Sequence, residues 1–309
     1  MNKIPIAFAF DSNLLFPACV CLSSLMMNAD KDTFYDIFIL HSHKEKLDKT
    51  MFDKLKEYYP NCSVTYRIVG DEFEEAFEIR GITTPAYYRL LIPELIPEYD
   101  KVIYSDVDIV FRRDLSELYQ VDMADNYIAA TYDLGLNLSN DGAKYMKSVK
   151  ELEYGDYIQS GFIILNNNHI LKDGLIQQFK ELSKRNLRYQ DQDILNIVCK
   201  DKIKILPFTY NMTDQAYYYL TNNQSSLTPK YLNDDPKKAY TISTIHYNGY
   251  KPWKSYCANF DIWWEVYRKS PFFDPQYYFN FFYSKLDEYD RLPFMKRVKI
   301  LLRYFFYKK

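Results

Sequence analysis

Short apolar runs alternate with helical patterns through the first two-thirds of the chain. This alternation predicts mostly parallel β-strands joined by crossover helices, because strands covered by helices on both faces are apolar along their whole length. The predicted helices cover residues 14–26, 47–58 and, as a short segment that Pro93 interrupts, 87–92. The predicted strands cover residues 4–10, 35–40, 63–69, 101–105, 127–131 and 161–165.

The pattern becomes less regular after about residue 206. A polar stretch at 222–238 predicts a loop, and residues 241–246 predict one further strand ahead of a segment rich in Pro, Trp and Tyr. The elements together predict an α/β fold.

Composition and charge narrow the class of protein. With 309 residues, of which 48% are hydrophobic and 26% charged, the chain can bury a large core. Its 39 Lys and Arg are balanced by 41 Asp and Glu, which disfavours nucleic acid as a partner. The five cysteines include no C-x-x-C pair, so they predict neither a zinc knuckle nor a disulfide framework and favour a reducing compartment. The apolar N-terminus predicts a buried strand rather than a signal peptide, and no apolar run is long enough to cross a membrane.

Residues 291–309 differ from the rest of the chain, because they carry seven Lys and Arg and no Asp or Glu. Their pattern predicts an amphipathic helix that starts at Pro293, with Lys296, Lys299 and Arg303 opposite an apolar face. Such a helix suits an anionic membrane surface, and the alternative is a C-terminal helix docked on its own domain. The apolar face consists of Phe294, Met295, Val298, Leu301, Leu302, Phe305 and Phe306.

Two carboxylates follow a predicted buried strand. Asp106 and Asp108, separated by Val107, come directly after the strand at 101–105. Ligands of open α/β sheets bind at the carboxyl ends of the strands, and carboxylate oxygens are preferred ligands of Mg²⁺ and Mn²⁺. An aspartate pair alone also fits a solvated turn that caps the next helix.

A second polar block follows the last predicted strand. Its glycine lets the backbone approach a ligand, and its lysine suits the charge of a phosphate, which favours a diphosphate site over a purely structural histidine. The block reads His246-Tyr247-Asn248-Gly249-Tyr250-Lys251-Pro252-Trp253.

With these blocks the chain resembles glycosyltransferase family eight, the retaining, metal-dependent sugar-nucleotide transferases that include glycogenin and bacterial lipopolysaccharide α-galactosyltransferases. The resemblance implies a GT-A fold, a mostly parallel Rossmann-like sheet flanked by helices. It implies a catalytic domain at residues 1–256, followed by an aromatic and basic helical extension at 257–309. Six ordered blocks carry it, at residues 6–13, 87–97, 104–111, 159–166, 190–196 and 246–253.

The resemblance assigns a metal site and a donor site. Asp106, Asp108 and His246 match the residues that hold Mn²⁺, or Mg²⁺, against the donor diphosphate. Asp11 and Asn13 match positions that contact the uracil and ribose of a UDP-sugar. The full set of positions that match the donor site is Asp11, Asn13, Arg89, Asp106, Val107, Asp108, Gln159, Gly249 and Lys251.

The residues around the transferred sugar follow from the same resemblance. Arg89 matches an arginine near the donor sugar, and Asp133, Gln159, Asp191 and Gln192 fall where the family contacts the sugar hydroxyls. The position of Gln192 lies on the β face of the anomeric carbon. Because an amide is a poor nucleophile, we expect front-face substitution, assisted by the leaving phosphate, rather than double displacement through a carboxylate.

Each of these residues also has a structural alternative. Asp11 and Asn13 could cap a helix, and Asp191 could belong to an acidic first turn. Arg89 could be a surface cation, and Gln159 could be an ordinary residue at the start of a strand.

Two positions depart from the family pattern. Only Tyr250 separates Gly249 from Lys251, where the family commonly has two residues. Leu14 follows Asn13, where an aromatic residue is often found. The contact of Lys251 with the diphosphate is therefore the least supported of the donor contacts.

These inferences predict a cytoplasmic enzyme, peripheral on the inner membrane face through residues 292–309. We expect it to move galactose or glucose from a UDP-sugar to lipopolysaccharide or another cell-surface or lipid-linked saccharide. One alternative is a glucosyltransferase that acts on a protein or a soluble glucan. Another is a non-catalytic, membrane-associated protein that binds sugar nucleotides.

Overall fold

The computed structural model describes residues 2–44, 46–78 and 84–306. Lys308 and Lys309 of the predicted basic tail lie outside the described residues. The chain divides into two compact units, residues 1–271 and residues 272–309.

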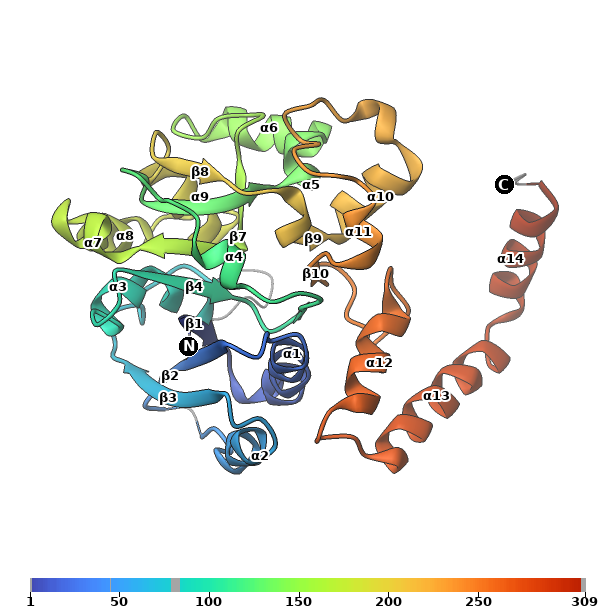
Figure 1. Ribbon diagram of the computed structural model, residues 1–309. Coiled ribbons are helices and arrows are strands. Elements are labelled where there is room, and N and C mark those ends of the chain that lie inside the picture. The colour runs from blue at the N-terminus through green and yellow to red at the C-terminus, as the bar shows by residue number, and fades with distance from the viewer. Residues whose placement is uncertain (1, 45, 79–83, 307–309) are drawn as a thin grey trace. The chain divides into compact units, whose positions relative to one another are not determined.

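A seven-stranded sheet forms the centre of the first unit (Figure 1). Its strand order is β3-β2-β1-β4-β7-β6-β8, and all six strands predicted within it are confirmed, with small shifts at their ends. The seven strands are β1 (Asn2–Ala9), β2 (Thr33–Ser42), β3 (Cys62–Val69), β4 (Lys101–Ser105), β6 (Ile128–Tyr132), β7 (Ile158–Asn166) and β8 (Ile203–Ile205).

The direction of one strand departs from the expected parallel arrangement. Strands β3, β2, β1 and β4 are parallel to one another, and β6 is parallel to β8. Strand β7 is antiparallel to both of its neighbours, β4 and β6. The sequence did not reveal this, because the apolar run of β7, buried at every position, indicates burial on both faces and not direction.

The reversed strand places its beginning beside the end of β4. Ser105 pairs with Phe162, and the backbone N–H of Asp106 donates to the carbonyl oxygen of Gly161 at 2.7 Å. Residues 159–161 therefore lie at the edge of the sheet where the acidic pair follows β4.

Helices flank this sheet, and their residues complete its core. Ile163 and Leu165 of β7 belong to the same buried cluster as Ile194 and Leu195 of the helix α9. The helices of the first unit are α1 (Leu15–Met27), α2 (Thr50–Tyr58), α3 (Ile92–Leu95), α4 (Ser116–Tyr119), α5 (Leu134–Asn137), α6 (Asn140–Ser148), α7 (Asn167–Lys172), α8 (Leu175–Leu182), α9 (Gln190–Val198), α10 (Asp214–Asn222), α11 (Lys238–Thr241) and α12 (Phe260–Lys269).

Two predicted elements differ in the structure. The helix predicted at 87–92 is mainly a 3₁₀ segment, η2 (Thr84–Leu91), that leads into α3. The strand predicted at 241–246 is wrong except for its last two residues. The hydroxyl of Ser243 donates to the carbonyl oxygen of Ala239, and the N–H of Ile242 donates to that of Lys238, so the chain stays in a turn after α11.

A second, three-stranded sheet joins distant parts of the chain. It consists of β5 (Ile109–Val110), β10 (Ile245–His246) and β9 (Met212–Thr213), in the order β5-β10-β9. Strand β10 is antiparallel to β5, with His246 opposite Ile109, and parallel to β9. This pairing fixes the late histidine next to the segment that carries the acidic pair.

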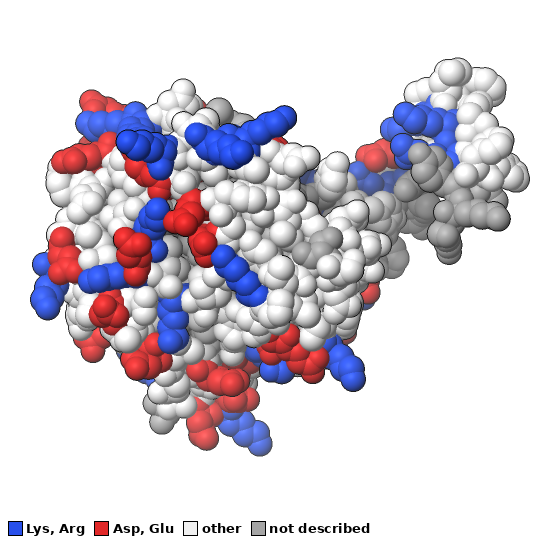
Figure 2. Space-filling model, turned by 90° about the horizontal axis from the view of Figure 1, so that it is seen from above, with Lys and Arg blue, Asp and Glu red and all other residues white. Residues whose placement is uncertain are grey.

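Charges of both signs are mixed on the surface. On the face shown in Figure 2, Lys and Arg are interspersed with Asp and Glu over the first unit. Ion pairs between surface residues of the first unit include Lys184 with Glu75 at 2.6 Å and Arg185 with Glu151 at 2.8 Å.

The second unit contains two helices, α13 (Pro275–Asp290) and α14 (Phe294–Phe306). The helix predicted after Pro293 is confirmed as α14. Phe294, Met295 and Phe305 of its predicted apolar face are all more than 70% exposed. Within the described residues, no helix has both the length and the hydropathy that crossing a bilayer requires.

Candidate active site

The acidic pair lies in the turn between β4 and β5. Asp106 follows β4 directly, and Asp108 precedes β5. Oδ1 of Asp106 accepts hydrogen bonds from the Tyr104 hydroxyl at 2.7 Å and from Nη2 of Arg89 at 2.9 Å. Oδ2 of Asp106 is left facing the interior of the site.

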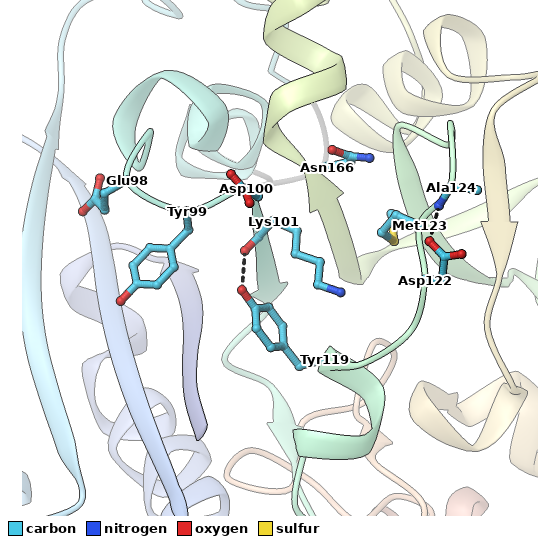
Figure 3. A pocket seen from close by; sticks show the side chains of 9 residues that line it. All are labelled: Glu98, Tyr99, Asp100, Lys101, Tyr119, Asp122, Met123, Ala124 and Asn166. Carbon is cyan, nitrogen blue, oxygen red and sulfur yellow. Dashed lines mark hydrogen bonds between the residues drawn. The ribbon is translucent and has the colours of Figure 1, made fainter. Parts of the chain in front are cut away.

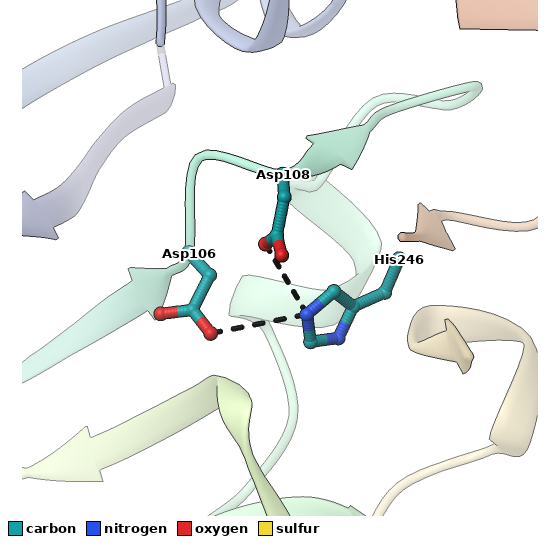
Figure 4. Close-up of side chains that lie close together, drawn as sticks. All are labelled: Asp106, Asp108 and His246. Carbon is teal, nitrogen blue, oxygen red and sulfur yellow. Dashed lines mark ion pairs between the residues drawn. The ribbon is translucent and has the colours of Figure 1, made fainter. Parts of the chain in front are cut away.

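His246 completes a triad with the two carboxylates (Figure 4). Its Nε2 lies 3.2 Å from Oδ1 of Asp108 and 3.8 Å from Oδ2 of Asp106. The His246 side chain is 1% exposed, so the imidazole lies in the interior beneath the partly buried carboxylates. The predicted convergence of these three side chains is therefore present in the structure.

The triad fits a divalent cation. One ligand atom from each residue lies within 4.8 Å of the others. Oδ1 of Asp108 is buried and has no hydrogen-bond partner in the described part of the chain. A Cβ atom on Gly161 would come within 2.5 Å of both Oδ2 of Asp106 and Cε1 of His246, so the glycine leaves room that any side chain would fill. Two carboxylates and an imidazole are ligands suited to Mn²⁺ and acceptable to Mg²⁺.

Positive charge keeps Asp108 ionised. Burial by itself raises the pKa of this carboxyl, but the neighbouring Lys251 and His246 lower it well below its usual range. The Lys251 ammonium donates to Oδ2 of Asp108 and to the carbonyl oxygen of Tyr247. The lysine of the short Gly249-Tyr250-Lys251 segment thus contacts the acidic pair directly.

Gly249 is placed where backbone and carboxylate approach closely. A Cβ atom there would lie 2.6 Å from Oδ2 of Asp214, at the start of α10. Burial raises the pKa of Asp214, and the neighbouring His246 and Lys251 lower it in part. Asp214 was not among the predicted site residues, because the irregular pattern after residue 206 predicted neither α10 nor its contact with Gly249.

Arg89 connects the acidic pair to α9. Its guanidinium donates to Asp106, pairs through Nε with Oδ2 of Asp191 at 3.2 Å and stacks 4.2 Å from the centre of the Tyr104 ring. Arg89 is only 5% exposed, so the alternative of a surface cation is wrong. Burial raises the pKa of Asp191 to about 6, although Arg89 opposes the shift.

Gln192 and Asp133 extend this network. Nε2 of Gln192 donates to Oδ2 of Asp133 at 3.1 Å, and its Oε1 accepts the backbone N–H of Ser160 at 3.1 Å. The hydroxyl of Ser160 donates to Oδ2 of Asp191 at 2.8 Å. Asp133 also caps α5, and burial raises its pKa. The network brings Arg89, Asp191, Gln192 and Asp133 together with the acidic pair.

Asp193 contacts tyrosine hydroxyls instead of Arg89 and Ser160. Its carboxylate accepts hydrogen bonds from the hydroxyls of Tyr157 at 2.6 Å and Tyr145 at 2.5 Å, and it is 0% exposed. The two aspartates of the first turn of α9 therefore have different surroundings, which their spacing in the sequence does not distinguish.

Asp11 and Asn13 follow β1, the parallel neighbour of β4. Oδ1 of Asp11 accepts the backbone N–H of Asn13 at 3.0 Å and caps the 3₁₀ turn η1 (Ser12–Leu14). The capping alternative is therefore correct for Asp11. Its position at the carboxyl edge of the sheet also leaves the expected contact with a nucleotide available.

Two residues at the triad were not predicted from the sequence. Gly161 carries a usable signal, since an isolated glycine in an apolar strand often marks a close approach. Asn211 precedes β9, and its Oδ1 lies 2.9 Å from Nδ1 of His246. It follows no motif, so only the pairing of β9 with β10 reveals its place.

A separate pocket of about 440 Å³ lies at the opposite end of β4 (Figure 3). Lys101 begins that strand and pairs with Asn166, the last residue of β7. The Lys101 ammonium is held by the carbonyl oxygen of Val121 at 2.9 Å. This pocket is distinct from the triad, which lies beyond the other end of the strand.

The mostly parallel sheet flanked by helices is the GT-A fold that the resemblance to glycosyltransferase family eight implies. The model of the family described as "Glycosyl transferase family 8" matches residues 5–257. The chain belongs to this family.

Individual relatives and a solved structure agree with the family match. A Haemophilus influenzae relative is 30% identical over 199 residues, which are 63% of this chain and 58% of that protein. A lipopolysaccharide 1,2-glucosyltransferase of Escherichia coli is 26% identical over 275 residues, covering 86% of this chain and 78% of the enzyme. The structure of the galactosyltransferase LgtC in complex with donor and acceptor sugar analogs superposes with a TM-score of 0.72 and 22% identity, over 89% of this chain and 99% of LgtC.

Proposed function

We propose that this protein is a metal-dependent, retaining hexosyltransferase that uses a UDP-sugar as donor. The convergence of Asp106, Asp108 and His246 at the carboxyl edge of the sheet is the observation that carries the proposal. The family match supports the reaction class.

Asp106, Asp108 and His246 would hold Mn²⁺ or Mg²⁺. The bound ion supplies Lewis-acid stabilisation of the negative charge that develops on the departing nucleoside diphosphate. Gly249 and Lys251 lie beside the triad. The Lys251 ammonium, which contacts Asp108, would donate a charge-assisted hydrogen bond to a diphosphate oxygen. Asp11 and Asn13, at the end of β1, would contact the uracil and ribose.

The remaining polar residues act on the donor sugar. Arg89, Asp133 and Asp191 orient its hydroxyls, and Gln159 and Val107 line the same edge of the sheet. The side-chain oxygen Oε1 of Gln192 accepts the backbone N–H of Ser160, and its Nε2 donates to Asp133, so both ends of the side-chain amide are held by the protein. Such an amide would stabilise positive charge at the anomeric carbon and, as a poor nucleophile, would not attack it.

The reaction then proceeds on one face of the sugar. The acceptor oxygen forms a bond to the anomeric carbon as the bond from that carbon to the UDP phosphate breaks. The proton of the acceptor hydroxyl passes to the departing phosphate oxygen, and UDP leaves. No carboxylate nucleophile is required, and the configuration at the anomeric carbon is retained.

We propose galactose or glucose as the transferred sugar and lipopolysaccharide or another cell-surface or lipid-linked saccharide as the acceptor. The Escherichia coli relative is named as a lipopolysaccharide glucosyltransferase and LgtC as a galactosyltransferase, which supports both hexoses.

The location follows from the acceptor and from the C-terminal region. We propose a cytoplasmic enzyme that binds the inner membrane face through residues 292–309. Helix α14 supports this, since apolar side chains such as Leu301 and Phe305 are exposed along it and Lys296, Lys299 and Arg303 occupy the opposite side.

The test is a donor screen with released UDP as the readout. Purified protein is incubated with several UDP-hexoses, with Mn²⁺ or with EDTA, and without acceptor. We expect slow hydrolysis of UDP-galactose or UDP-glucose that EDTA abolishes. Equal release with EDTA would contradict the metal role, and no release from any UDP-sugar would favour a non-catalytic protein. Transfer to a soluble glucan or to the protein itself would point to the glycogenin-like alternative.

A further inference from the structure

The two ring nitrogens of His246 have different surroundings. Nε2 faces the carboxylates of Asp106 and Asp108, whereas Nδ1 lies 2.9 Å from Oδ1 of Asn211. A neutral imidazole carries one proton, so the partner of Nδ1 decides which nitrogen presents a lone pair to the carboxylates.

The orientation of the Asn211 amide is fixed by a further residue. Nδ2 of Asn211 donates to Oε1 of Gln159 at 2.8 Å. The same Oε1 accepts the backbone N–H of Gly161 at 2.6 Å. Because a backbone N–H can only donate, it fixes the Gln159 oxygen as an acceptor, and that oxygen in turn fixes Asn211 with its N–H group toward Gln159.

The direction of the last hydrogen bond follows from this sequence of contacts. Oδ1 of Asn211 is left facing the histidine and can only accept, so Nδ1 of His246 carries the proton. Gln159, Asn211 and His246 are 7%, 2% and 1% exposed, so water is largely kept from replacing a lost partner. A reversed Asn211 amide would bring two acceptors, Oδ1 of Asn211 and Oε1 of Gln159, together in this buried place and leave both without a donor.

The competing tautomer has an obvious partner. Oδ1 of Asp108 is buried without a hydrogen bond in the described chain and lies 3.2 Å from Nε2. If Nε2 carried the proton, it would donate to this oxygen. That hydrogen bond would occupy both the imidazole and the carboxylate that a cation needs.

We propose that Gln159 and Asn211 are positioning residues that hold His246 in the tautomer able to bind a metal through Nε2. The backbone N–H of Gly161 sets the orientation of the whole series. The inference rests on the proposed metal role of the triad. In this proposal Oε1 of Gln159 orients the Asn211 amide, in addition to the expected contact of Gln159 with the donor.

The experiment compares variants that remove or keep the acceptor oxygen Oε1 at position 159. Gln159→Met removes it, and Asn211→Leu removes the next link with a side chain of similar size. Gln159→Glu keeps an acceptor toward both Gly161 and Asn211. Gln177→Met changes an exposed glutamine on α8 and serves as the matched control.

Two readouts are used. Mn²⁺ affinity is measured by calorimetry on the folded proteins without any sugar nucleotide. The His246 tautomer is measured by long-range ¹H–¹⁵N spectra of metal-free protein with ¹⁵N-labelled histidine, and His246→Gln assigns the signal. We expect the wild type to show a proton on Nδ1, and Gln159→Met and Asn211→Leu to bind Mn²⁺ about 10- to 100-fold more weakly with a mixed or reversed tautomer.

Gln159→Glu is expected to keep the Nδ1 proton and to bind Mn²⁺ at least as tightly as the wild type. If Gln159→Met and Asn211→Leu both keep the Mn²⁺ affinity and the His246 tautomer of the wild type, the inference is overturned and the metal role is left intact. If the wild type itself fails to bind Mn²⁺, the proposed metal role fails, and the metal-free spectra alone then decide whether Gln159 and Asn211 set the tautomer. Because two breaking variants are used, failure of one to fold does not remove the test.

Discussion

The ammonium group of Lys251 contacts Oδ2 of Asp108, 143 residues away in the chain. His246 lies on the other oxygen of the same carboxylate, at 3.2 Å. One carboxylate is therefore shared by a candidate metal ligand and by the lysine expected to bind the diphosphate. A cation held by the triad would repel this lysine, which would then be available to the phosphates of a donor.

Replacing Lys251 is expected to separate these two effects. Lys251→Met removes a competing positive charge, so Mn²⁺ affinity without nucleotide should rise by up to about tenfold, equivalent to about 1.4 kcal/mol. UDP affinity in saturating Mn²⁺ should fall about tenfold or more, because a charge-assisted contact is lost. Calorimetry measures both, with Lys254→Met as an exposed neighbouring control. Weaker Mn²⁺ binding by Lys251→Met would contradict the competition.

Asp108 is expected to be required for transfer and not for folding. Asp108→Asn removes one charge from the triad, so we expect Mn²⁺ binding to weaken at least about 100-fold and kcat to fall by about 10² to 10³. Transfer is followed by release of UDP, and folding by circular dichroism. Asp125→Asn, at an exposed aspartate, is the control. A folded Asp108→Asn protein with near-normal turnover would refute the assignment.

Gly161 is expected to be needed for the space within the triad. Gly161→Ala places a Cβ atom within 2.5 Å of Asp106 and His246, so one of the two must move. We expect Mn²⁺ affinity to fall more than about tenfold, and stability to fall by about 1–3 kcal/mol from overpacking. Gly70→Ala is the control, because only the flexible Glu72 side chain approaches that position closely. Unchanged Mn²⁺ binding by Gly161→Ala would show that the triad tolerates the added group.

Asp191 is expected to make stability depend on pH. Burial raises its pKa to about 6, so between about pH 4 and pH 6 the folded protein holds a proton that the unfolded chain releases. Stability from this group is therefore lost as the pH rises through that window, by up to about 3 kcal/mol. Asp191→Asn removes the titration.

Urea unfolding of both proteins at pH 4.5 and pH 7, with EDTA present, measures this effect. The free energy of unfolding of the wild type, relative to that of Asp191→Asn, should be lower at pH 7 than at pH 4.5. A difference that is constant with pH would mean that Asp191 has an ordinary pKa in the folded protein.

The C-terminal helix is expected to bind anionic membranes. Deleting residues 292–309 should abolish cosedimentation with vesicles that contain phosphatidylglycerol, while release of UDP in solution persists. Replacing Lys296, Lys299 and Arg303 with Gln should weaken binding and reduce its dependence on salt, since each cation contributes about 1 kcal/mol. Equal sedimentation of the deleted and full chains would exclude this helix as the anchor.

Local pattern was sufficient for the six predicted strands of the central sheet, for α1, α2 and α14, and for the acidic pair, whereas the helices from α4 to α11 were not predicted. The strand at 101–105 and the two aspartates after it could be predicted because the apolar run in the middle of the strand is followed directly by acidic residues. The direction of β7 could not be predicted, since an apolar run is the same in either direction. The strand expected at 241–246 failed because local hydrogen bonds of Ser243 and Ile242 hold a turn there.

By itself the sequence determined the α/β class, the family and the residue types of the candidate site, because hydrophobic periodicity and ordered motifs are properties of short segments. Only the tertiary structure decided which of those residues meet. The pairing of β10 with β5 brings His246 to Asp108, and the pairing with β9 brings Asn211 to His246. The burial of Arg89 between two aspartates was decided in the same way. Contacts between distant segments depend on strand order and register, and a short motif contains no information about its partner across the sheet.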